Sequence, residues 1–380
     1  MRNLLRKEGA RQLNLIYFEG YCETGMFMLD EPVKARITSF LTEFEKWLDT
    51  DEGKEFLRER EEKMREFRGL LNAEAIERLS EPDFRRIIVS LWAYVGWTNK
   101  DYVADRVLKS TDFNTLRSEL KNLLYGAAPL ADRYDRFFEK VKGIGPAGVT
   151  EMLAFTEPKQ YGIWNDKSRR ALEILGLGQR LPTRKYKISG REYGEVNEAL
   201  KSIFRIIKPG EAEPNLVYVD FFLFYLVTRE SSREAIVISE EDYDFDHDEI
   251  VEKLVEIGSG LGFEANSEQQ IAKGARVDVL WQARIANLGV VSYVFEVQRG
   301  GSIDSLILNL QRARNNPTVQ KLVVVANTRD LKKIKDEVES LSEDFRKSLA
   351  YLEAKDVKRA SDLLSELNSI ISRLELVKSL

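Results

Sequence analysis

The chain has 380 residues, of which 43% are hydrophobic and 32% are charged, and its formal net charge is −5. That length exceeds the size at which one hydrophobic core is comfortable, so two domains are expected. The net charge excludes a uniformly basic nucleic-acid-binding protein, and any affinity for DNA must come from local charge. One cysteine and one histidine nearly exclude a structural zinc site or a Ser-His-Asp triad, which leaves carboxylates as the main candidates for chemistry.

Composition also bears on the location of the protein. The sequence has no run of about 18 apolar residues, so no membrane span is expected. Its first residues lack the apolar segment and cleavage site of a secretory signal. Richness in Glu, Lys and Arg, with a single cysteine, is typical of an intracellular and heat-adapted protein. We therefore expect a cytoplasmic protein, associated with the nucleoid if DNA is its partner.

The first part of the chain, 1–229, is predicted to be an all-α domain. Ser80 and Asp83 have the spacing of a capping box, and Pro129 suits a first helical position. Almost no strand pattern occurs in this part. Apolar residues at helical spacing predict helices over 35–48, 53–71, 83–95, 114–125, 129–141, 147–155, 167–175 and 195–207.

After an acidic connection at 230–247, with a short strand at 235–238 as an option, the pattern changes. Residues 248–380 alternate between strand and helix patterns, which predicts an α/β domain around a mixed central sheet. Strands are expected near Phe263, around Asp278 and Glu296, at 321–326 and at 349–352. Helices are expected at 248–259, 302–315, 331–339 and 360–378.

Two of the predicted strands each carry one carboxylate among apolar residues. Asp278 lies in the run VDVLW and Glu296 in the run YVFEVQ. A carboxylate in such surroundings is costly unless something binds its charge. Two that converge form an oxygen-rich pocket suited to Mg²⁺, and a metal there can activate water and neutralise charge on a phosphodiester.

The order of helix, Asp strand, Glu-x-Gln strand, helix and strand resembles the PD-(D/E)XK nuclease core of restriction and repair endonucleases. Asp278, Glu296 and Gln298 carry the resemblance. It implies that Asp278, Glu296 and the backbone carbonyl of Val297 hold Mg²⁺, with Mn²⁺ as an alternative, and that Gln298 positions the attacking water. The family most often has Lys at that last position. Gln is neutral and supplies no charge stabilisation.

Two features beside the triplet extend the resemblance. The helix before the first core strand often lends the site an extra acid, which here favours Glu252, with Glu249 as runner-up; ordinary surface glutamates are the alternative. Gly300 and Gly301 form a turn without Cβ atoms, and the helix that starts at Ser302 offers free N–H groups to a phosphate. An ordinary capped helix after a turn is the alternative.

A second motif lies in the run 141–148, VKGIGPAG, between two predicted helices. Gly143 and Gly145 permit positive φ in a tight hairpin, and the backbone amides that follow can contact a DNA phosphate. The run resembles a helix-hairpin-helix motif. A simple turn, with glycines for close helix packing, is the alternative.

Residues 80–230 resemble the base-excision DNA glycosylase superfamily, which is built on that hairpin. Asp166 follows the hairpin at about the family's spacing, which implies a role in base release. Bifunctional members have a nucleophilic Lys where this chain has Ala147, so Schiff-base chemistry is not expected. Asp166 is either the catalytic base of a monofunctional glycosylase or a helix N-cap, a role that also suits Asn165.

Basic and aromatic residues around the hairpin are candidate DNA contacts. A basic segment attracts phosphate, and exposed rings can stack on a displaced base; a solvated loop and core packing are the alternatives. The basic candidates are Lys167, Arg169, Arg170, Arg180, Arg184, Lys185, Lys187 and Arg191. The aromatic candidates are Trp92, Tyr94, Trp97 and Trp164.

These patterns together predict a Mg²⁺-dependent endodeoxyribonuclease of restriction or repair that acts on double-stranded DNA. Two strand cuts usually need two sites, so a homodimer or a partner nuclease is expected. One alternative is a monofunctional DNA glycosylase or modified-base reader that uses Asp166. The other is a non-catalytic DNA-binding protein whose nuclease fold has decayed through the Lys-to-Gln change at Gln298.

Overall fold

The computed structural model describes residues 27–94, 101–230, 245–285 and 289–372. The chain divides into two compact units, Met1–Ala93 with Val103–Ala235 and Tyr94–Tyr102 with Ile236–Leu380. The first is helical in its described residues, and the second contains a five-stranded mixed sheet. This agrees with the predicted order of an α part followed by an α/β part. Most of the predicted connection at 230–247, its optional strand at 235–238, and Trp97 lie outside the described residues.

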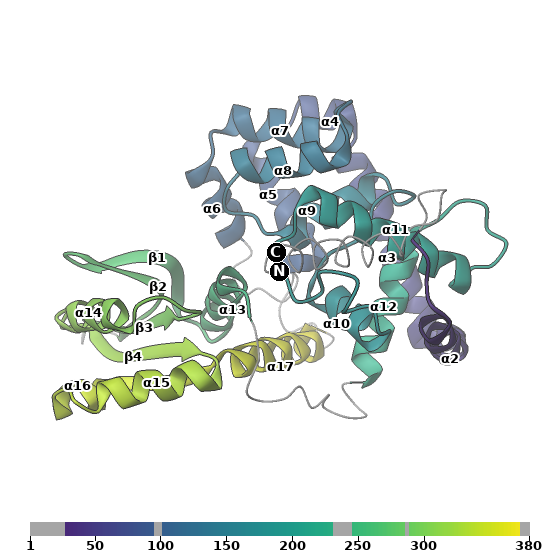
Figure 1. Ribbon diagram of the computed structural model, residues 1–380. Helices are drawn as coiled ribbons and strands as arrows, with labels where there is room; N and C mark the ends of the chain where they lie inside the picture. The colour runs from purple at the N-terminus through teal and green to yellow at the C-terminus, as the bar shows by residue number, and fades with distance from the viewer. Residues whose placement is uncertain (1–26, 95–100, 231–244, 286–288, 373–380) are drawn as a thin grey trace, which may run out of the picture. The chain divides into compact units, whose positions relative to one another are not determined.

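The N-terminal unit is built from helices joined by turns and longer loops (Figure 1). Its elements are α2 (Glu31–Leu48), α3 (Asp51–Leu70), α4 (Ala73–Glu77), α5 (Glu81–Ser90), the 3-10 turn η1 (Trp92–Tyr94), α6 (Asp101–Ser110), α7 (Phe113–Tyr125), α8 (Leu130–Lys140), α9 (Pro146–Thr156), α10 (Asp166–Ile174), α11 (Gly190–Ile207) and α12 (Leu216–Glu230).

Local capping chemistry sets several of these boundaries. Ser80 and Asp83 form the predicted capping box of α5. That helix ends at Ser90 instead of continuing to residue 95, because Leu91 is extended and the next residues form η1. Pro129 is the N-cap of α8 and not its first helical residue, so the predicted position was wrong by one.

Three helices of this unit, α4, α6 and α12, were not predicted. Nearly every residue of α12 is apolar (LVYVDFFLFYLVTRE), and most of its side chains are buried. A helix that is buried on most sides shows no amphipathic period, which is the signal that sequence patterns rely on.

In the described ranges, no helix combines the length and the apolar character needed to cross a membrane.

The N-terminal unit buries a small charged cluster. Arg60 of α3 donates to Asp220 of α12 at 2.9 Å, and both side chains are about nine-tenths buried. Glu151 of α9 is 1% exposed and accepts hydrogen bonds from the backbone N–H groups of Trp92 (2.6 Å) and Ala93 (2.9 Å). Burial raises the pKa of Glu151 to about 7, although both backbone hydrogen bonds oppose the shift.

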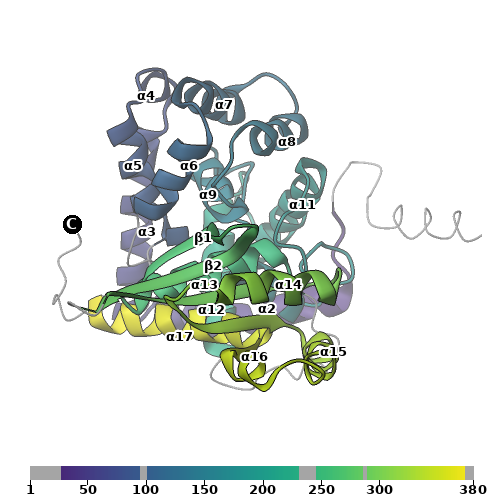
Figure 2. The same cartoon turned by 90° about the vertical axis from the view of Figure 1, so that its left-hand side faces the viewer.

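The C-terminal unit starts with α13 and then forms one sheet whose strands lie in chain order, β1-β2-β3-β4-β5. The pairs β1–β2 and β2–β3 are antiparallel, and β3–β4 and β4–β5 are parallel. Figure 2 shows β1 and β2 side by side. Helices make the two parallel connections, as such crossovers require. The elements are α13 (His247–Gly260), β1 (Glu264–Ala272), β2 (Ala275–Ile285), β3 (Gly289–Val297), α14 (Ile303–Arg314), β4 (Val319–Ala326), α15 (Thr328–Val338), α16 (Glu343–Ser348), β5 (Leu349–Glu353) and α17 (Ala354–Ser372).

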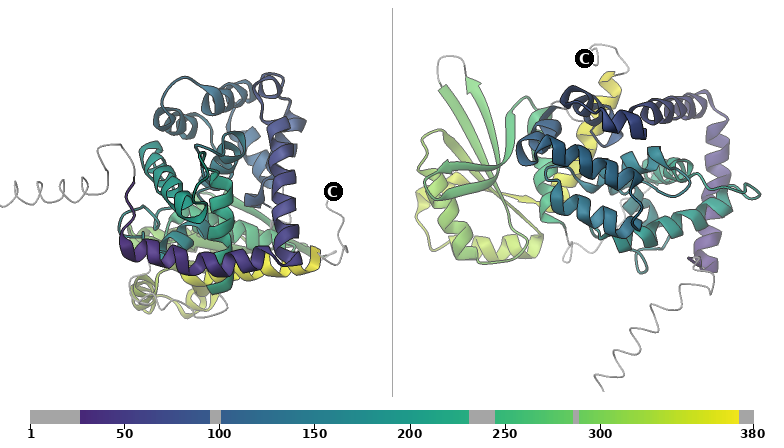
Figure 3. Two further views of the ribbon diagram at one scale, coloured as in Figure 1. Left: turned by 90° about the vertical axis from the view of Figure 1, so that its right-hand side faces the viewer. Right: turned by 90° about the horizontal axis from the view of Figure 1, so that it is seen from above.

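Helices cover this sheet in two groups (Figure 3, right). On one side α14 and α15 bury an apolar core with the strands, in which Leu306, Leu310 and Ile334 meet Leu322 and Val324. On the other side α13 packs on β1 and β2 and lies against α17. This arrangement fixes both helices that flank the strands carrying Asp278 and Glu296.

Candidate functional site

The strands that carry the two predicted carboxylates diverge where those residues lie. The β2–β3 ladder ends at the pair Val279–Phe295, and Asp278 and Glu296 stand one step beyond it. Past that point β2 stays paired with β1, and β3 stays paired with β4. We call the opening between β2 and β3 beyond this last pair the strand fork. Asp278 and Glu296 occupy equivalent positions on its two sides.

Side chains satisfy the backbone groups that lose their ladder partners at the strand fork. The N–H of Val297 donates to Oδ2 of Asp278 at 2.7 Å. The carbonyl of Arg276 accepts from Nδ2 of Asn309 at 2.7 Å. Backbone polar groups left unpaired inside a protein are costly, so these contacts hold the fork open in a defined geometry.

Glu296 is 9% exposed and lies close to Asp278. Burial, and then the charge of Asp278, raise the pKa of Glu296 to about 8. Nδ2 of Asn309 donates to Oε1 of Glu296 at 2.7 Å and favours the ionised carboxylate against that shift. Two adjacent acids with one pKa raised are typical of a site that is completed by a proton or a cation.

The donors at the fork suit a divalent cation that prefers oxygen. Asp278 and Glu296 offer carboxylate oxygens, and Val297 adds a backbone carbonyl, a set that fits Mg²⁺ because this ion retains several waters. In the described ranges, no group of three or more His, Cys, Asp or Glu side chains is placed to hold a metal. A cation at the fork would thus depend on two carboxylates, backbone oxygen and water.

His247, the first residue of α13, is a site residue that the sequence patterns did not identify. Its Nε2 lies 3.4 Å from Oδ2 of Asp278, and its Nδ1 lies 3.0 Å from Oδ1 of Asp248. These hydrogen bonds, first to Asp248 and then to Asp278, raise the pKa of His247 to about 10. The imidazolium is therefore a cation beside the fork at neutral pH. The sequence offered one signal for this residue: it lies at the start of the helix that was predicted to lend an acid to the site.

Two acids of α13 contact α17. Glu249 is buried and pairs with Lys358 of α17 at 3.1 Å. Glu256 is buried and accepts from Ser361 of α17 at 2.9 Å. Both acids thereby link α13 to α17. Glu252, which was favoured as an extra ligand, is half-buried. Among the described residues it is not part of a group of three or more side chains that could hold a metal. His247 of α13 contacts Asp278.

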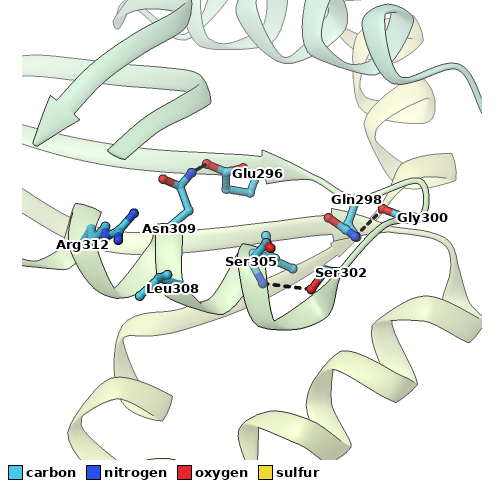
Figure 4. Close-up of a pocket in the computed structure, with 9 residues that line it drawn as sticks. Glu296, Gln298, Gly300, Ser302, Ser305, Leu308, Asn309 and Arg312 are labelled. Atoms are coloured by element: carbon cyan, nitrogen blue, oxygen red, sulfur yellow. Dashed lines mark hydrogen bonds between the residues drawn. The ribbon is translucent and has the colours of Figure 1, made fainter. Parts of the chain in front are cut away.

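A pocket of about 460 Å³ opens beside Glu296 (Figure 4). Gln298 at its edge donates through Nε2 to the carbonyl of Gly300, so its amide supports the turn after β3. Gly300 and Gly301 have φ of +124° and +92°, which explains why glycines are needed there. The lining residues are Glu296, Gln298, Gly300, Ser302, Ser305, Leu306, Leu308, Asn309 and Arg312.

The start of α14 has the predicted capping chemistry. Ser302 is its N-cap, and its side chain accepts from the N–H of Ser305 at 3.2 Å. The expected capped helix is therefore present at the pocket. Ser302 and Ser305 at the start of this helix line the same pocket as Glu296 (Figure 4).

In the N-terminal unit, the predicted hairpin joins α8 to α9. Gly143 has φ of +89°, as expected, and its carbonyl accepts from Nε of Arg106 at 2.7 Å. Gly145 has φ of −88° and is the N-cap of α9, so positive φ is not needed there. Ala147 lies in the first turn of α9 and is half-buried.

Asp166 is the first residue of α10, and Asn165 is the N-cap. The side chain of Asn165 accepts from the N–H of Ser168 at 2.8 Å, so the capping role belongs to Asn165. Asp166 pairs with Arg169 at 3.0 Å and with Arg170 at 3.6 Å. The carboxylate of Asp166 is therefore paired with two cations of its own helix.

Most of the aromatic residues that were candidates for stacking on a displaced base belong to the core. Trp164 is 1% exposed, and its Nε1 donates to the carbonyl of Tyr186 at 3.2 Å. Tyr94 is buried, and the ring of Trp92 packs on Phe155. The prediction that these rings stack on a displaced base is therefore wrong for Tyr94 and Trp164, which are enclosed.

Several predicted DNA contacts have acidic or aromatic partners instead. Lys185 pairs with Glu192, and Arg180 pairs with Asp30 at 3.3 Å. Lys167 lies over the ring of Phe224 at 4.4 Å. Arg184, Lys185 and Lys187 are nevertheless exposed on one loop of the predicted basic segment, and Arg191 is exposed near the start of α11.

A scan against protein-family models finds no match to this chain. Searches of curated proteins and of solved structures find no match either.

Proposed function

We propose that this protein is a divalent-metal-dependent DNA endonuclease whose active site is the strand fork. The observation that carries the proposal is the meeting of Asp278 and Glu296 where β2 and β3 diverge. Both acids come from neighbouring antiparallel strands, and α14 follows directly after the second one. The strand and helix order is the one expected from the resemblance to PD-(D/E)XK nucleases.

In this proposal Asp278, Glu296 and the carbonyl of Val297 hold Mg²⁺ or Mn²⁺. The bound cation supplies charge neutralisation on a phosphodiester and an activated water. Gln298 lines the pocket, and its amide orients polar groups without adding charge. Its hydrogen bond to Gly300 fixes the turn that leads into α14.

The pocket beside Glu296 supports a polyanionic substrate. Ser302, Ser305 and Arg312 line it opposite the carboxylate. The N-terminal N–H groups of α14 add positive electrostatic potential. A phosphate of the DNA backbone has the acceptor oxygens that these donors need.

The N-terminal unit is proposed to bind duplex DNA through its hairpin and the exposed basic loop. Gly143 gives the hairpin its left-handed turn, and the N–H groups of Ala147 and Gly148 in the first turn of α9 have no acceptor within their own helix. Arg184, Lys185 and Lys187 provide exposed cations. A homodimer would place two forks on one duplex, one for each strand.

Single substitutions at the fork test the proposal. We expect Asp278→Ala and Glu296→Ala each to abolish cleavage of plasmid and oligonucleotide duplexes in Mg²⁺ or Mn²⁺. DNA affinity measured by fluorescence anisotropy should stay within about twofold of wild type, because the hairpin unit is unchanged. Glu264→Ala is the matched control, since this acid is exposed at the start of β1.

The substrate panel should contain unmodified, methylated, mismatched and branched DNA. Cleavage that persists in both fork variants would refute the active site. Tight DNA binding without cleavage of any substrate, and without heat on titration of Mn²⁺, would instead indicate a non-catalytic DNA-binding protein. Alkali-labile sites that form in the presence of chelator would indicate base release.

A further inference from the structure

The side chain of Asn309 donates two hydrogen bonds to groups on two different strands. It lies in the middle of α14, and its Nδ2 donates both to Oε1 of Glu296 and to the carbonyl of Arg276, each at 2.7 Å. Carboxylate and carbonyl oxygens only accept, so the orientation of this amide is fixed by its partners. Both amide hydrogens are in use, and Figure 4 shows the side chain extended from α14 to Glu296.

The two partners of Asn309 lie on the two sides of the strand fork. Arg276 is two residues before Asp278 on β2, and Glu296 lies on β3. The amide therefore crosses the gap where the β2–β3 ladder has ended. It holds the Glu296 carboxylate in one rotamer and ties it to the strand of Asp278.

We propose that Asn309 is the positioning residue that sets the Glu296 carboxylate for metal binding. The inference rests on the proposed function, and it adds a residue from outside the Asp278–Glu296–Gln298 triplet. A carboxylate ligand is oriented by the hydrogen bonds that its oxygens accept. With Oε1 held by Asn309, Glu296 keeps its orientation beside Asp278.

If Asn309 only stabilised the fold, its loss would affect metal binding no more than the loss of another asparagine that links two parts of this unit. Asn316, which follows α14, makes the same kind of link: its Nδ2 donates to the carbonyl of Ile271 at 2.9 Å, and its Oδ1 accepts from the N–H of Thr318 at 3.0 Å. This asparagine joins loop and strand at a position away from Glu296. It is therefore a matched control for the loss of one buried amide.

The test compares Asn309→Ala and Asn309→Leu with Asn316→Ala in the full-length protein. Asn309→Leu keeps a side chain of similar size but removes the donor, and it adds no charge to the site. Removal of such a supporting hydrogen bond weakens metal affinity by roughly 10- to 100-fold. We expect both Asn309 variants to raise the dissociation constant for Mn²⁺, measured by titration calorimetry, and the Mn²⁺ concentration for half-maximal cleavage by that factor. Asn316→Ala should change neither by more than about twofold.

Thermal unfolding without metal separates positioning from stability. Equal shifts in Mn²⁺ dependence for Asn309→Ala and Asn316→Ala, in proportion to their losses of Tm, would overturn the inference. Unchanged metal affinity in both Asn309 variants, with wild-type cleavage intact, would overturn it while leaving the proposed function standing. If the wild-type protein neither binds Mn²⁺ nor cleaves DNA, the proposed function fails, and this inference fails with it.

Discussion

The Nε2 atom of His247 lies 3.4 Å from Oδ2 of Asp278, so the first residue of α13 places a cation beside the strand fork. The cation offsets part of the repulsion between Asp278 and Glu296. It also competes with any metal for the same carboxylate. The single histidine of the chain is therefore a natural point at which to alter the charge of the site.

We expect His247→Ala to destabilise the metal-free protein by roughly 0.5–1 kcal/mol, a range that reflects a partly exposed ion pair. Because the competing cation is gone, added Mn²⁺ should raise the Tm more in this variant than in wild type. Differential scanning calorimetry with chelator and with Mn²⁺ measures both effects. Asp248→Asn keeps the imidazole next to Asp278 and should give a smaller change. A lower Mn²⁺-induced shift in His247→Ala would contradict competition.

Glu296→Gln should stabilise the metal-free protein while removing its response to metal. The Oε1 of Gln can still accept from Asn309, and its amide N–H can donate to Asp278 without the proton uptake that Glu296 needs to do the same in the folded state. We expect a gain of roughly 1–2 kcal/mol at neutral pH, measured by denaturant titration in chelator.

The pH dependence of that gain follows from the raised pKa. Since the pKa of Glu296 rises from its ordinary value near 4.5 to about 8, the folded state holds a proton that the unfolded state releases. The contribution of Glu296 to stability is present below about pH 4.5 and is lost as pH rises through about 8. The advantage of Glu296→Gln should therefore grow from pH 5 to pH 9. A constant or shrinking advantage would show that the pKa of Glu296 is not raised in the folded protein.

The strands and the turn around the strand fork could be predicted because their signals are local. The apolar runs around Asp278 and Glu296 gave the strands β2 and β3, and the glycines at 300–301 with Ser302 gave the turn and start of α14. Each of these features depends on neighbouring residues alone, so one sequence is sufficient to see them.

The remaining features depend on contacts between distant parts of the chain. The length of the β2–β3 ladder decides that Asp278 and Glu296 lie at an opening, and no local pattern reports where a ladder stops. His247 and Asn309 acquire their roles through packing of α13 and α14 on the sheet. At α10, Asn165 and Asp166 are both good capping residues, and the backbone conformation assigned the cap to Asn165.

Glu151 makes the stability of the N-terminal unit dependent on pH. Its carboxylate is fully buried beneath η1, and its pKa is raised from about 4.5 to about 7. Stability from this group is present below about pH 4.5 and lost as pH rises through about 7, a change on the order of 3 kcal/mol. Lys63 lowers the pKa of Glu151 and Asp220 raises it, so the shift already includes both neighbours.

Denaturant titrations between pH 4.5 and pH 8.5 measure this change. We expect Glu151→Gln to remove the fall in stability over this range, although the variant starts lower at acidic pH because one of its two backbone donors meets an amide N–H. Glu157→Gln, an exposed acid just after the same helix, should keep the wild-type profile. An unchanged profile in Glu151→Gln would assign the pH dependence to another group.

The hairpin turn can be tested with two glycines that share a backbone conformation. Gly143 and Gly210 have φ of +89° and +93°, and both therefore disfavour any residue with a Cβ. A Cβ at Gly143 would lie 3.0 Å from the backbone of Arg106, whereas at Gly210 nothing lies within 4 Å. Gly210→Ala should cost roughly 1–2 kcal/mol from backbone strain alone. Gly143→Ala should cost more, because α6 or the hairpin must shift.

The same pair separates stability from DNA binding. If the hairpin contacts the phosphate backbone as proposed, Gly143→Ala should weaken binding to a duplex oligonucleotide by about tenfold, the equivalent of roughly 1.4 kcal/mol, at a temperature where both variants are folded. Gly210→Ala should bind like wild type. Fluorescence anisotropy at two salt concentrations measures the affinities, and circular dichroism verifies folding. Equal affinities for the two variants would place the DNA contact outside the hairpin and direct attention to the loop of Arg184 and Lys187.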